Sequence, residues 1–112
     1  MGYAKSYLHQ VVKVKIERPL GTKHPSYDFI YELNYGFIPG TIAPDGKEID
    51  AYVLGITEPI DEFEGVCIAI IHRTNDNDDK VVIAPKWEEY SDEEIKRLTD
   101  FQEKFFESEI VR

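Results

Sequence analysis

The sequence predicts a mainly β fold of the α+β class, a small closed or nearly closed barrel with one helix near its C-terminal end. Two observations support this class. Short runs of β-branched and aromatic residues alternate with turn-forming Gly, Pro, Asn and Asp, which is the pattern of successive strands. Helical periodicity occurs in only one later segment. Because 112 residues have room for one compact core, we expect a single domain over residues 1–112.

The first expected strand shows the clearest pattern. In "VVKVKIE", residues 11–17, Val and Ile alternate with Lys, which is the period of a half-buried strand. Arg18-Pro19 ends this run. The other runs of strand length are aromatic or apolar, and they are residues 29–37, 50–56, 66–73 and 80–85. We expect these strands to pair antiparallel, and short strands in this number favour a barrel, because closure removes exposed sheet edges.

A capping box marks the expected helix. Ser91 is followed three residues later by Glu94, so each can hydrogen-bond the backbone N–H of the other. Apolar residues then recur at helical spacing and predict an amphipathic helix that packs on the sheet; they are Ile95, Leu98, Phe101 and Phe105.

Composition excludes some classes of partner. The net charge of -9 argues against nucleic acid, whose backbone needs a basic protein surface. The sequence has no apolar run long enough for a membrane span or a signal peptide, so we expect a cytoplasmic protein that does not bind membranes. Its single cysteine, Cys67, reads as a buried apolar residue.

Acidic residues form a first candidate site in "DGKEIDAYVLG". Gly46 permits a tight turn after Asp45, and Asp50 shares one strand face with Tyr52. A carboxylate held at the end of a buried strand suits Mg²⁺, which takes one or two protein carboxylates and completes its shell with water and phosphate oxygens. The alternative is an Asx-turn at Asp45 and a strand cap at Asp50. Spacing alone favours that structural interpretation.

Two further polar clusters could join this site. The loop "HRTNDNDDK" follows an apolar strand, and Asp76 and Asp78 would complete a metal site if the loop lies at the same barrel rim as Asp50. Otherwise it is a soluble hairpin loop. The segment "RPLGTKHP" offers Arg18, Lys23 and His24 as a phosphate clamp or as solvated charge.

The stretch "YELNYGFIPGTIAPDGKEIDAYVLG" resembles the signature region of the soluble family I inorganic pyrophosphatases, in which a Tyr, an Asn-Tyr-Gly and an acidic motif occur in that order. The later "DDKVVIAP" is similar to the family's Asp-x-Lys stretch, with Asp78 and Lys80 as the matching residues. The "KIERP" segment is a weaker match, in which Glu17 corresponds to an active-site glutamate.

The resemblance implies a five-stranded, OB-like barrel and Mg²⁺-dependent hydrolysis of a phosphoanhydride, with Mn²⁺ as an alternative cofactor. Carried over to this chain, the metal ligands would be Asp45, Asp50 and Asp78, with Asp76 as an addition if the loop shifts. Tyr35, Asp50 and Lys80 would be catalytic, and substrate phosphate would meet Lys23, Tyr31, Arg73 and Lys80.

Three positions depart from the family pattern. Lys47 stands where the family's middle aspartate is expected, and Glu48 replaces the proline after it. The expected place of another aspartate falls near Arg73. A lysine in this loop removes a carboxylate and repels cations.

Three hypotheses therefore stand. The leading one is divalent-metal-dependent hydrolysis of inorganic pyrophosphate or a related small phosphoanhydride. The alternative is a non-catalytic anion- or nucleotide-binding module in which Lys47 replaces a catalytic aspartate. The third is a homo-oligomeric barrel whose aromatic residues serve an interface, and we expect a homo-oligomer in any case. His24 and His72 are expected as hydrogen-bonded loop or strand-end residues.

Overall fold

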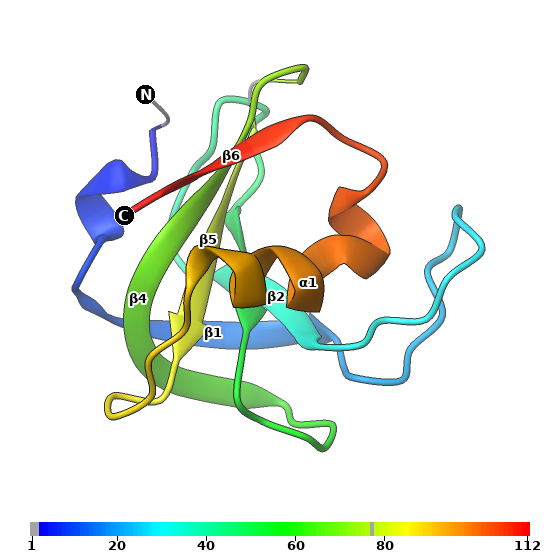
Figure 1. Ribbon diagram of the computed structural model, residues 1–112, viewed down its shortest axis with the longest axis horizontal. Helices are drawn as coiled ribbons and strands as arrows, with labels where there is room; N and C mark the ends of the chain where they lie inside the picture. The colour runs from blue at the N-terminus through cyan, green and yellow to red at the C-terminus, as the bar shows by residue number, and fades with distance from the viewer. Residues whose placement is uncertain (1–2, 77) are drawn as a thin grey trace.

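A closed β-barrel with one helix against its outer surface forms the fold of the computed structural model, which describes residues 3–76 and 78–112 (Figure 1). The elements are η1 (Lys5–Tyr7), β1 (Val11–Arg18), β2 (Asn34–Ile38), β3 (Ile49–Val53), β4 (Glu62–Arg73), β5 (Asp79–Ala84), α1 (Asp92–Glu103) and β6 (Ser108–Val111).

Strand pairing closes the barrel in the order β1-β2-β3-β5-β4, because β4 also pairs with β1. This confirms the predicted five-stranded barrel with a C-terminal helix. Neighbours pair antiparallel except β3 and β5, which run parallel with Asp50 beside Lys80. The expectation that all strands pair antiparallel was therefore wrong for this pair. The connection from β3 to β5, which includes β4, supplies the crossover that a parallel pair needs.

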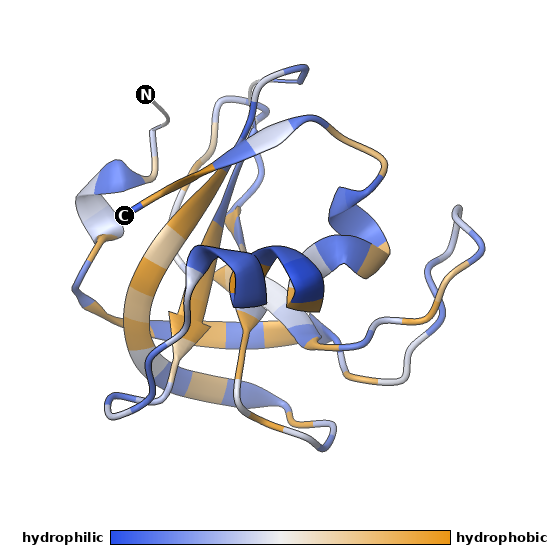
Figure 2. Ribbon diagram, viewed as in Figure 1, coloured by the Kyte–Doolittle hydropathy of each residue, from blue (hydrophilic) through white to orange (hydrophobic). Residues whose placement is uncertain are grey.

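Two apolar clusters lie on opposite faces of the strands. Strand alternation sends Val12, Ala51 and Val81 into the barrel interior, together with Cys67, which is buried as predicted. The opposite faces carry Tyr52 and other apolar residues that pack under α1. Figure 2 shows the apolar stretches of β4 and β5 and the hydrophilic outer surface of α1. The sharing of one face by Asp50 and Tyr52 therefore directs Asp50 outward, toward the helix side.

The predicted capping box is present. The backbone N–H of Glu94 donates to Ser91 Oγ at 3.1 Å, and the N–H of Ser91 donates to Glu94 Oε1 at 2.9 Å. Helix α1 ends at Glu103, so the prediction that Phe105 belongs to it was wrong. The chain turns there because residues 108–111 complete the edge of β4 as strand β6. No helix in the described ranges is long and apolar enough to cross a membrane.

The second predicted strand is also shorter than expected. Strand β2 begins at Asn34, whereas the aromatic pattern predicted a start at residue 29. Residues 29–33 instead belong to the long connection between β1 and β2, where Lys23 and Ile30 form an isolated antiparallel bridge. Aromatic residues in this connection pack on one another rather than pair in the barrel, for example Phe29 edge-to-face with Tyr31, whose ring centroid is 5.4 Å away.

A buried hydrogen-bond chain fixes the last turn of α1 to the sheet. The hydroxyl of Tyr52 donates to Glu103 Oε2 at 2.6 Å and accepts from Gln102 Nε2 at 2.7 Å. The hydroxyl of Tyr31 donates to Gln102 Oε1 at 2.8 Å. Because all four side chains are buried, each polar group depends on its partners rather than on water.

Gly36 lets β1 and β2 approach closely. A Cβ atom at this position would lie 1.9 Å from the carbonyl oxygen of Lys15. The adjoining pairing contains an irregularity between Ile16 and Arg18, after which Arg18 pairs with Tyr35. The close approach of the strands and the bulge together bring Arg18 and Tyr35 to the same end of the barrel.

We expect Gly36→Ala to destabilise the fold by about 3 kcal/mol, because the added methyl group must push one strand away from the other. Urea unfolding followed by circular dichroism measures this change. The control is Gly40→Ala, at a position with φ of +80° and no atom near the added methyl, where only the left-handed backbone penalty of about 1 kcal/mol applies. Equal losses at both positions would contradict the steric argument.

Tyr52→Phe tests the hydrogen-bond chain under α1. Loss of the hydroxyl removes one of the donors to Glu103 Oε2 and leaves the buried Gln102 Nε2 without its acceptor, so we expect a cost of about 1–3 kcal/mol. The same unfolding measurement on Tyr27→Phe is the control, because the Tyr27 side chain is 43% exposed. A Tyr52→Phe protein as stable as the control would show that these hydrogen bonds contribute little to the stability of the fold.

Candidate active-site cavity

A cavity of about 410 Å³ opens on the barrel surface beside the C-terminal end of α1. We call it the site cavity. Strands β1, β2, β3 and β5 contribute to its wall, together with the β1–β2 connection. Of the residues predicted from the sequence, those that line it are Tyr31, Tyr35, Asp45, Asp50, Arg73, Asp78 and Lys80.

Lys80 lies between two of the predicted metal ligands. Its Nζ is 2.5 Å from Asp50 Oδ2 and 2.7 Å from Asp78 Oδ2. The parallel register of β3 and β5 produces the first contact, because Asp50 and Lys80 are direct partners. Burial alone would lower the pKa of Lys80, but the two carboxylates raise it above its usual value. The ammonium is therefore charged at neutral pH.

Asp78 has a second donor from a distant part of the chain. The hydroxyl of Tyr3 donates to Asp78 Oδ1 at 2.7 Å. Burial would raise the pKa of Asp78, but Lys80 and the hydrogen bonds outweigh it and hold that pKa below its usual value. Asp78 is therefore a carboxylate with several partners, and nothing in its own segment of sequence indicates the contact with Tyr3.

Arg73 is fixed in direction by the end of α1. Its Nε donates to Glu103 Oε1 at 3.1 Å and its Nη2 to Glu103 Oε2 at 2.7 Å, the two-bond geometry that orients a guanidinium. The ring of Phe106 lies over the guanidinium, with the centroid 3.6 Å away. The remaining nitrogen, Nη1, faces Asp76 at 3.4 Å and Asp78 at 3.8 Å.

The two predicted tyrosines are neutral hydrogen-bond donors. Burial, followed by the charge of Asp50, raises the pKa of Tyr35 well above its usual value. Burial also raises the pKa of Tyr31, although Arg18 acts in the opposite direction. Both hydroxyls keep their protons at neutral pH, so neither can act as a base. The Tyr31 hydroxyl donates its proton to Gln102 Oε1, whereas the Tyr35 hydroxyl can donate to a phosphate oxygen.

In the loop before β3, Asp45 forms an Asx-turn and also lies at the candidate site, the two alternatives that the sequence left open. Asp45 Oδ1 accepts from the backbone N–H of Lys47 at 3.0 Å, which is the Asx-turn, and Gly46 has φ of +86°. The same Asp45 lines the site cavity, as does Lys47. Asp76, by contrast, lies in an adjoining hollow of about 390 Å³ that Asp45 and Asp78 also line.

The segment "RPLGTKHP" is divided by the structure. Arg18 and His24 line the site cavity, whereas Lys23 is 71% exposed with Nζ 3.9 Å from Asp28. His24 Nδ1 accepts from the backbone N–H groups of Ser26 and Tyr27 at 2.9 and 3.0 Å. Burial and then Arg18 lower the pKa of His24, so the neutral ring carries its proton on Nε2.

Sequence reasoning did not select several residues of the cavity wall. Glu17 was noted only as a weak match, and Tyr27, Gln102 and Phe106 were not considered as site residues. His72 lies elsewhere, with Nδ1 2.7 Å from Asp79 Oδ1. No local pattern marks Gln102 and Phe106, because they lie far along the chain from the other site residues and reach the cavity only through the docking of α1.

Charges in the site cavity balance. Its acidic residues are Glu17, Asp45, Asp50 and Asp78, and its basic residues are Arg18, Lys47, Arg73 and Lys80. The cavity is thus formally neutral in a protein of net charge -9.

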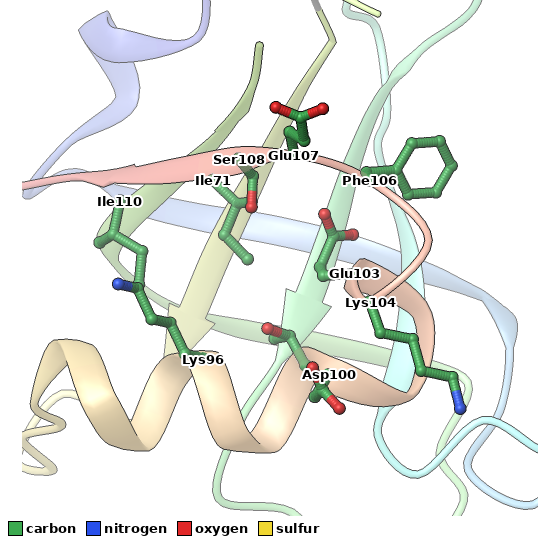
Figure 3. Close-up of a pocket in the computed structure, with 10 residues that line it drawn as sticks. Ile71, Lys96, Asp100, Glu103, Lys104, Phe106, Glu107, Ser108 and Ile110 are labelled. Carbon is green, nitrogen blue, oxygen red and sulfur yellow. The ribbon is translucent and has the colours of Figure 1, made fainter. Parts of the chain in front are cut away.

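A second cavity of about 440 Å³ lies between α1 and β6 (Figure 3). Its lining includes Ile71 and Ile110 together with charged side chains of the helix surface such as Lys96 and Asp100. Glu103 and Phe106 also border it, but the Glu103 carboxylate is bonded to Arg73 and Tyr52. Because most of the predicted phosphate-binding and acidic residues line the site cavity instead, we take that one as the candidate active site.

The carboxylates of the site cavity suit a Mg²⁺ ion that takes only a few of its ligands from the protein. Carboxylate oxygens are what Mg²⁺ prefers, and the ion commonly takes only one or two of them. Among the described residues, no group of three or more His, Cys, Asp or Glu side chains is placed to hold a metal ion. Asp45, Asp50 and Asp78 would therefore act singly or in pairs, with water and phosphate oxygens as the remaining ligands.

Comparisons with known proteins agree with the fold and the motifs. The structure superposes on the inorganic pyrophosphatase of Ehrlichia chaffeensis with a TM-score of 0.70 and 16% identity, over 91% of this chain and 85% of that one. It superposes on the Helicobacter pylori enzyme with a TM-score of 0.66 and 17% identity, over 85% of this chain and 75% of that one. Identities this low show the shared fold alone.

Sequence comparison extends the likeness beyond the fold. The chain is 37% identical over 78 residues to the inorganic pyrophosphatase of Aeropyrum pernix, a match that spans 65% of this chain but only 41% of that protein. The family profile described as inorganic pyrophosphatase matches residues 8–110. That match covers nearly all of the barrel, the site cavity and α1, and the chain therefore belongs, as a divergent member, to the family I inorganic pyrophosphatases.

Proposed function

We propose that the chain hydrolyses inorganic pyrophosphate or a related small phosphoanhydride, with Mg²⁺ or Mn²⁺ as the cofactor. One observation carries the proposal: a single cavity gathers Asp45, Asp50 and Asp78 with Lys80 and two protonated tyrosines. Carboxylates for a metal and donors for phosphate are the two requirements of this chemistry. Family membership supports the same substrate.

Phosphate oxygens would be bound by the cations and hydroxyls of the wall. Lys80 and Arg73 are held in position by carboxylates, and Tyr31 is fixed by its bond to Gln102. Such preorganised donors offset the charge that develops on the leaving phosphate when the bridging P–O bond breaks. Of the two cations that the sequence grouped in one segment, Arg18 is better placed than Lys23 to bind phosphate, because Arg18 lines the site cavity.

Asp50 is the residue best placed to receive a proton from the attacking water. Its side chain is 34% exposed at the cavity wall, and Lys80 holds it in one direction. The ring centroid of Tyr35 is 5.8 Å from Lys80 Nζ. Its hydroxyl would donate to the phosphate oxygens of the substrate. A Mg²⁺ ion held by Asp45, Asp50 or Asp78 would polarise the phosphoryl oxygens and neutralise part of their charge.

Asp50→Asn tests the hydrolase proposal directly. We expect phosphate release from pyrophosphate to fall by about 10²-fold or more, because the amide cannot accept the proton or hold the cation equally well. The assay measures released phosphate at several Mg²⁺ and Mn²⁺ concentrations, with nucleoside di- and triphosphates in parallel. Asp61→Asn is the matched control, because Asp61 is an exposed carboxylate outside the cavity wall. Wild-type protein that is inert toward every phosphoanhydride would refute the proposal.

A second candidate function rests on Lys47. Its exposed side chain lines the site cavity, and among the described residues no carboxylate oxygen lies within 4.0 Å of its Nζ. A cation in that situation attracts an anionic ligand without a metal. The chain would then be a binding module for anions or nucleotides on a pyrophosphatase scaffold.

The expected effect of Lys47→Ala on this second function is about fivefold to tenfold weaker binding of pyrophosphate in the absence of Mg²⁺, since one charge contact is lost. Titration calorimetry in a chelator-treated buffer measures the affinity. Binding that requires Mg²⁺ in the wild type would exclude the module. Turnover that arises only in Lys47→Asp would instead identify a hydrolase scaffold that lacks one carboxylate.

Other expectations stay predictions. The family implies pyrophosphate as the partner molecule, but a homo-oligomer and a cytoplasmic location are still untested proposals. Sedimentation of the purified chain would measure the first of these.

A further inference from the structure

We propose that an aromatic shelf at the mouth of the site cavity binds a nucleobase, so that a nucleoside diphosphate is the phosphoanhydride that fits this chain best. The aromatic shelf consists of His24, Tyr27 and Phe105. The inference rests on the proposed function only for the diphosphate end of the ligand. It concerns three residues to which that function gives no role.

Tyr27 joins the aromatic shelf to the cavity. It belongs to the connection between β1 and β2, it is 43% exposed, and it lines the same cavity as Lys80 and Arg73. Phe105, which follows α1, is also 43% exposed and stacks on Tyr27, with ring centroids 4.8 Å apart and 20° between the ring planes. Figure 1 shows the connection extending outward on the side of the barrel where α1 ends. Aromatic surface therefore faces solvent beside the groups that would bind phosphate.

Other aromatic rings already attach the connection to the helix and the barrel. Phe29 packs edge-to-face on Phe101 of α1, with centroids 5.7 Å apart. Tyr31 stacks on Tyr35 at 5.3 Å. Tyr27 adds a further ring outside these contacts, and a ring exposed next to a binding cavity is available for stacking by a ligand.

His24 places a polar group beside these rings. Its Nδ1 accepts from two backbone N–H groups, and burial and Arg18 lower its pKa, so the neutral ring carries its proton on Nε2. The His24 ring lies edge-on to Tyr27, with centroids 5.0 Å apart. A fixed N–H donor next to an aromatic surface matches a nucleobase, which has a flat face for stacking and acceptor atoms along its edge.

Inorganic pyrophosphate has no planar or apolar part that could use the aromatic shelf. The cavity volume of about 410 Å³ is in the range that encloses organic ligands. A diphosphate held at Lys80 and Arg73 would leave the Tyr27 end of the cavity unfilled. A nucleoside joined to that diphosphate would fill it, and stacking on aromatic side chains accepts any base.

Two non-hydrolysable diphosphates test the inference without turnover. They are methylenediphosphonate and α,β-methylene-ADP, which differ by the adenosine group of the second. Titration calorimetry in buffer with Mg²⁺ measures the affinity of the wild-type protein for each. We expect α,β-methylene-ADP to bind about tenfold or more tightly than methylenediphosphonate, because stacking of a base on an aromatic side chain is worth about that much. Equal affinities, or no binding of either compound, would overturn the inference.

Tyr27→Ala removes the ring that joins the aromatic shelf to the cavity. We expect the ratio of the two affinities to fall by about fivefold, whereas Tyr27→Phe, which keeps a ring, retains the wild-type ratio. Trp87→Ala is the matched control, because Trp87 is 83% exposed and lies outside the cavity wall, and we expect no change there. Equal weakening of both compounds in a folded Tyr27→Ala protein would contradict the inference, since the ring would then serve only to hold the connection in place.

The rival occupant of the aromatic shelf is a second copy of the chain. Sedimentation of the wild-type and Tyr27→Ala proteins tests this alternative. Wild-type protein that self-associates, together with a monomeric Tyr27→Ala protein of unchanged affinity ratio, would overturn the inference. The same association state in both proteins, with the lower ratio in Tyr27→Ala, supports the nucleobase.

The nucleobase proposal and the hydrolase proposal fail separately. Protein that prefers α,β-methylene-ADP through Tyr27 but releases no phosphate from any phosphoanhydride would refute the hydrolase and leave the nucleobase site intact. Protein that hydrolyses pyrophosphate but binds both compounds equally well would do the reverse.

Discussion

The parallel pairing of β3 with β5 is the constraint on which the site depends. It sets Asp50 beside Lys80 in register, and the strand alternation that turns Ala51 and Val81 into the barrel turns these two residues outward. A buried ammonium needs a compensating charge. The contacts of Lys80 with Asp50 and Asp78 therefore compensate its buried charge and also shape the cavity. Loss of either carboxylate would affect both the stability of the fold and the geometry of the site.

Much of this could be predicted from the sequence. Alternation in residues 11–17 gave β1, the capping box gave the start of α1, and the Asp-x-Lys motif selected Asp78 and Lys80. These features are local, because propensity and periodicity act over a few residues. The resemblance in "YELNYGFIPGTIAPDGKEIDAYVLG" contributed the barrel type and the gathering of Tyr31, Tyr35 and Asp50 in one place.

The rest depends on contacts between distant segments. The choice of Arg18 over Lys23 follows from the bulge in β1 and from Gly36, which local pattern does not reveal. The contact of Tyr3 with Asp78 joins residues 75 apart. Strand β6 was missed because "FFESEI" continues a helical pattern, and only the open edge of β4 makes an extended conformation more favourable there.

Closure of the barrel also determines when the site exists. Arg18, Tyr35, Asp50 and Lys80 come from β1, β2, β3 and β5, so no two neighbouring strands present a complete cavity. Partly assembled chains have no place for the ligand, and such non-local pairings form late in folding. A ligand that binds only the closed form draws the population toward it by mass action. The cellular concentration of the ligand would therefore influence the fraction of the protein that is folded.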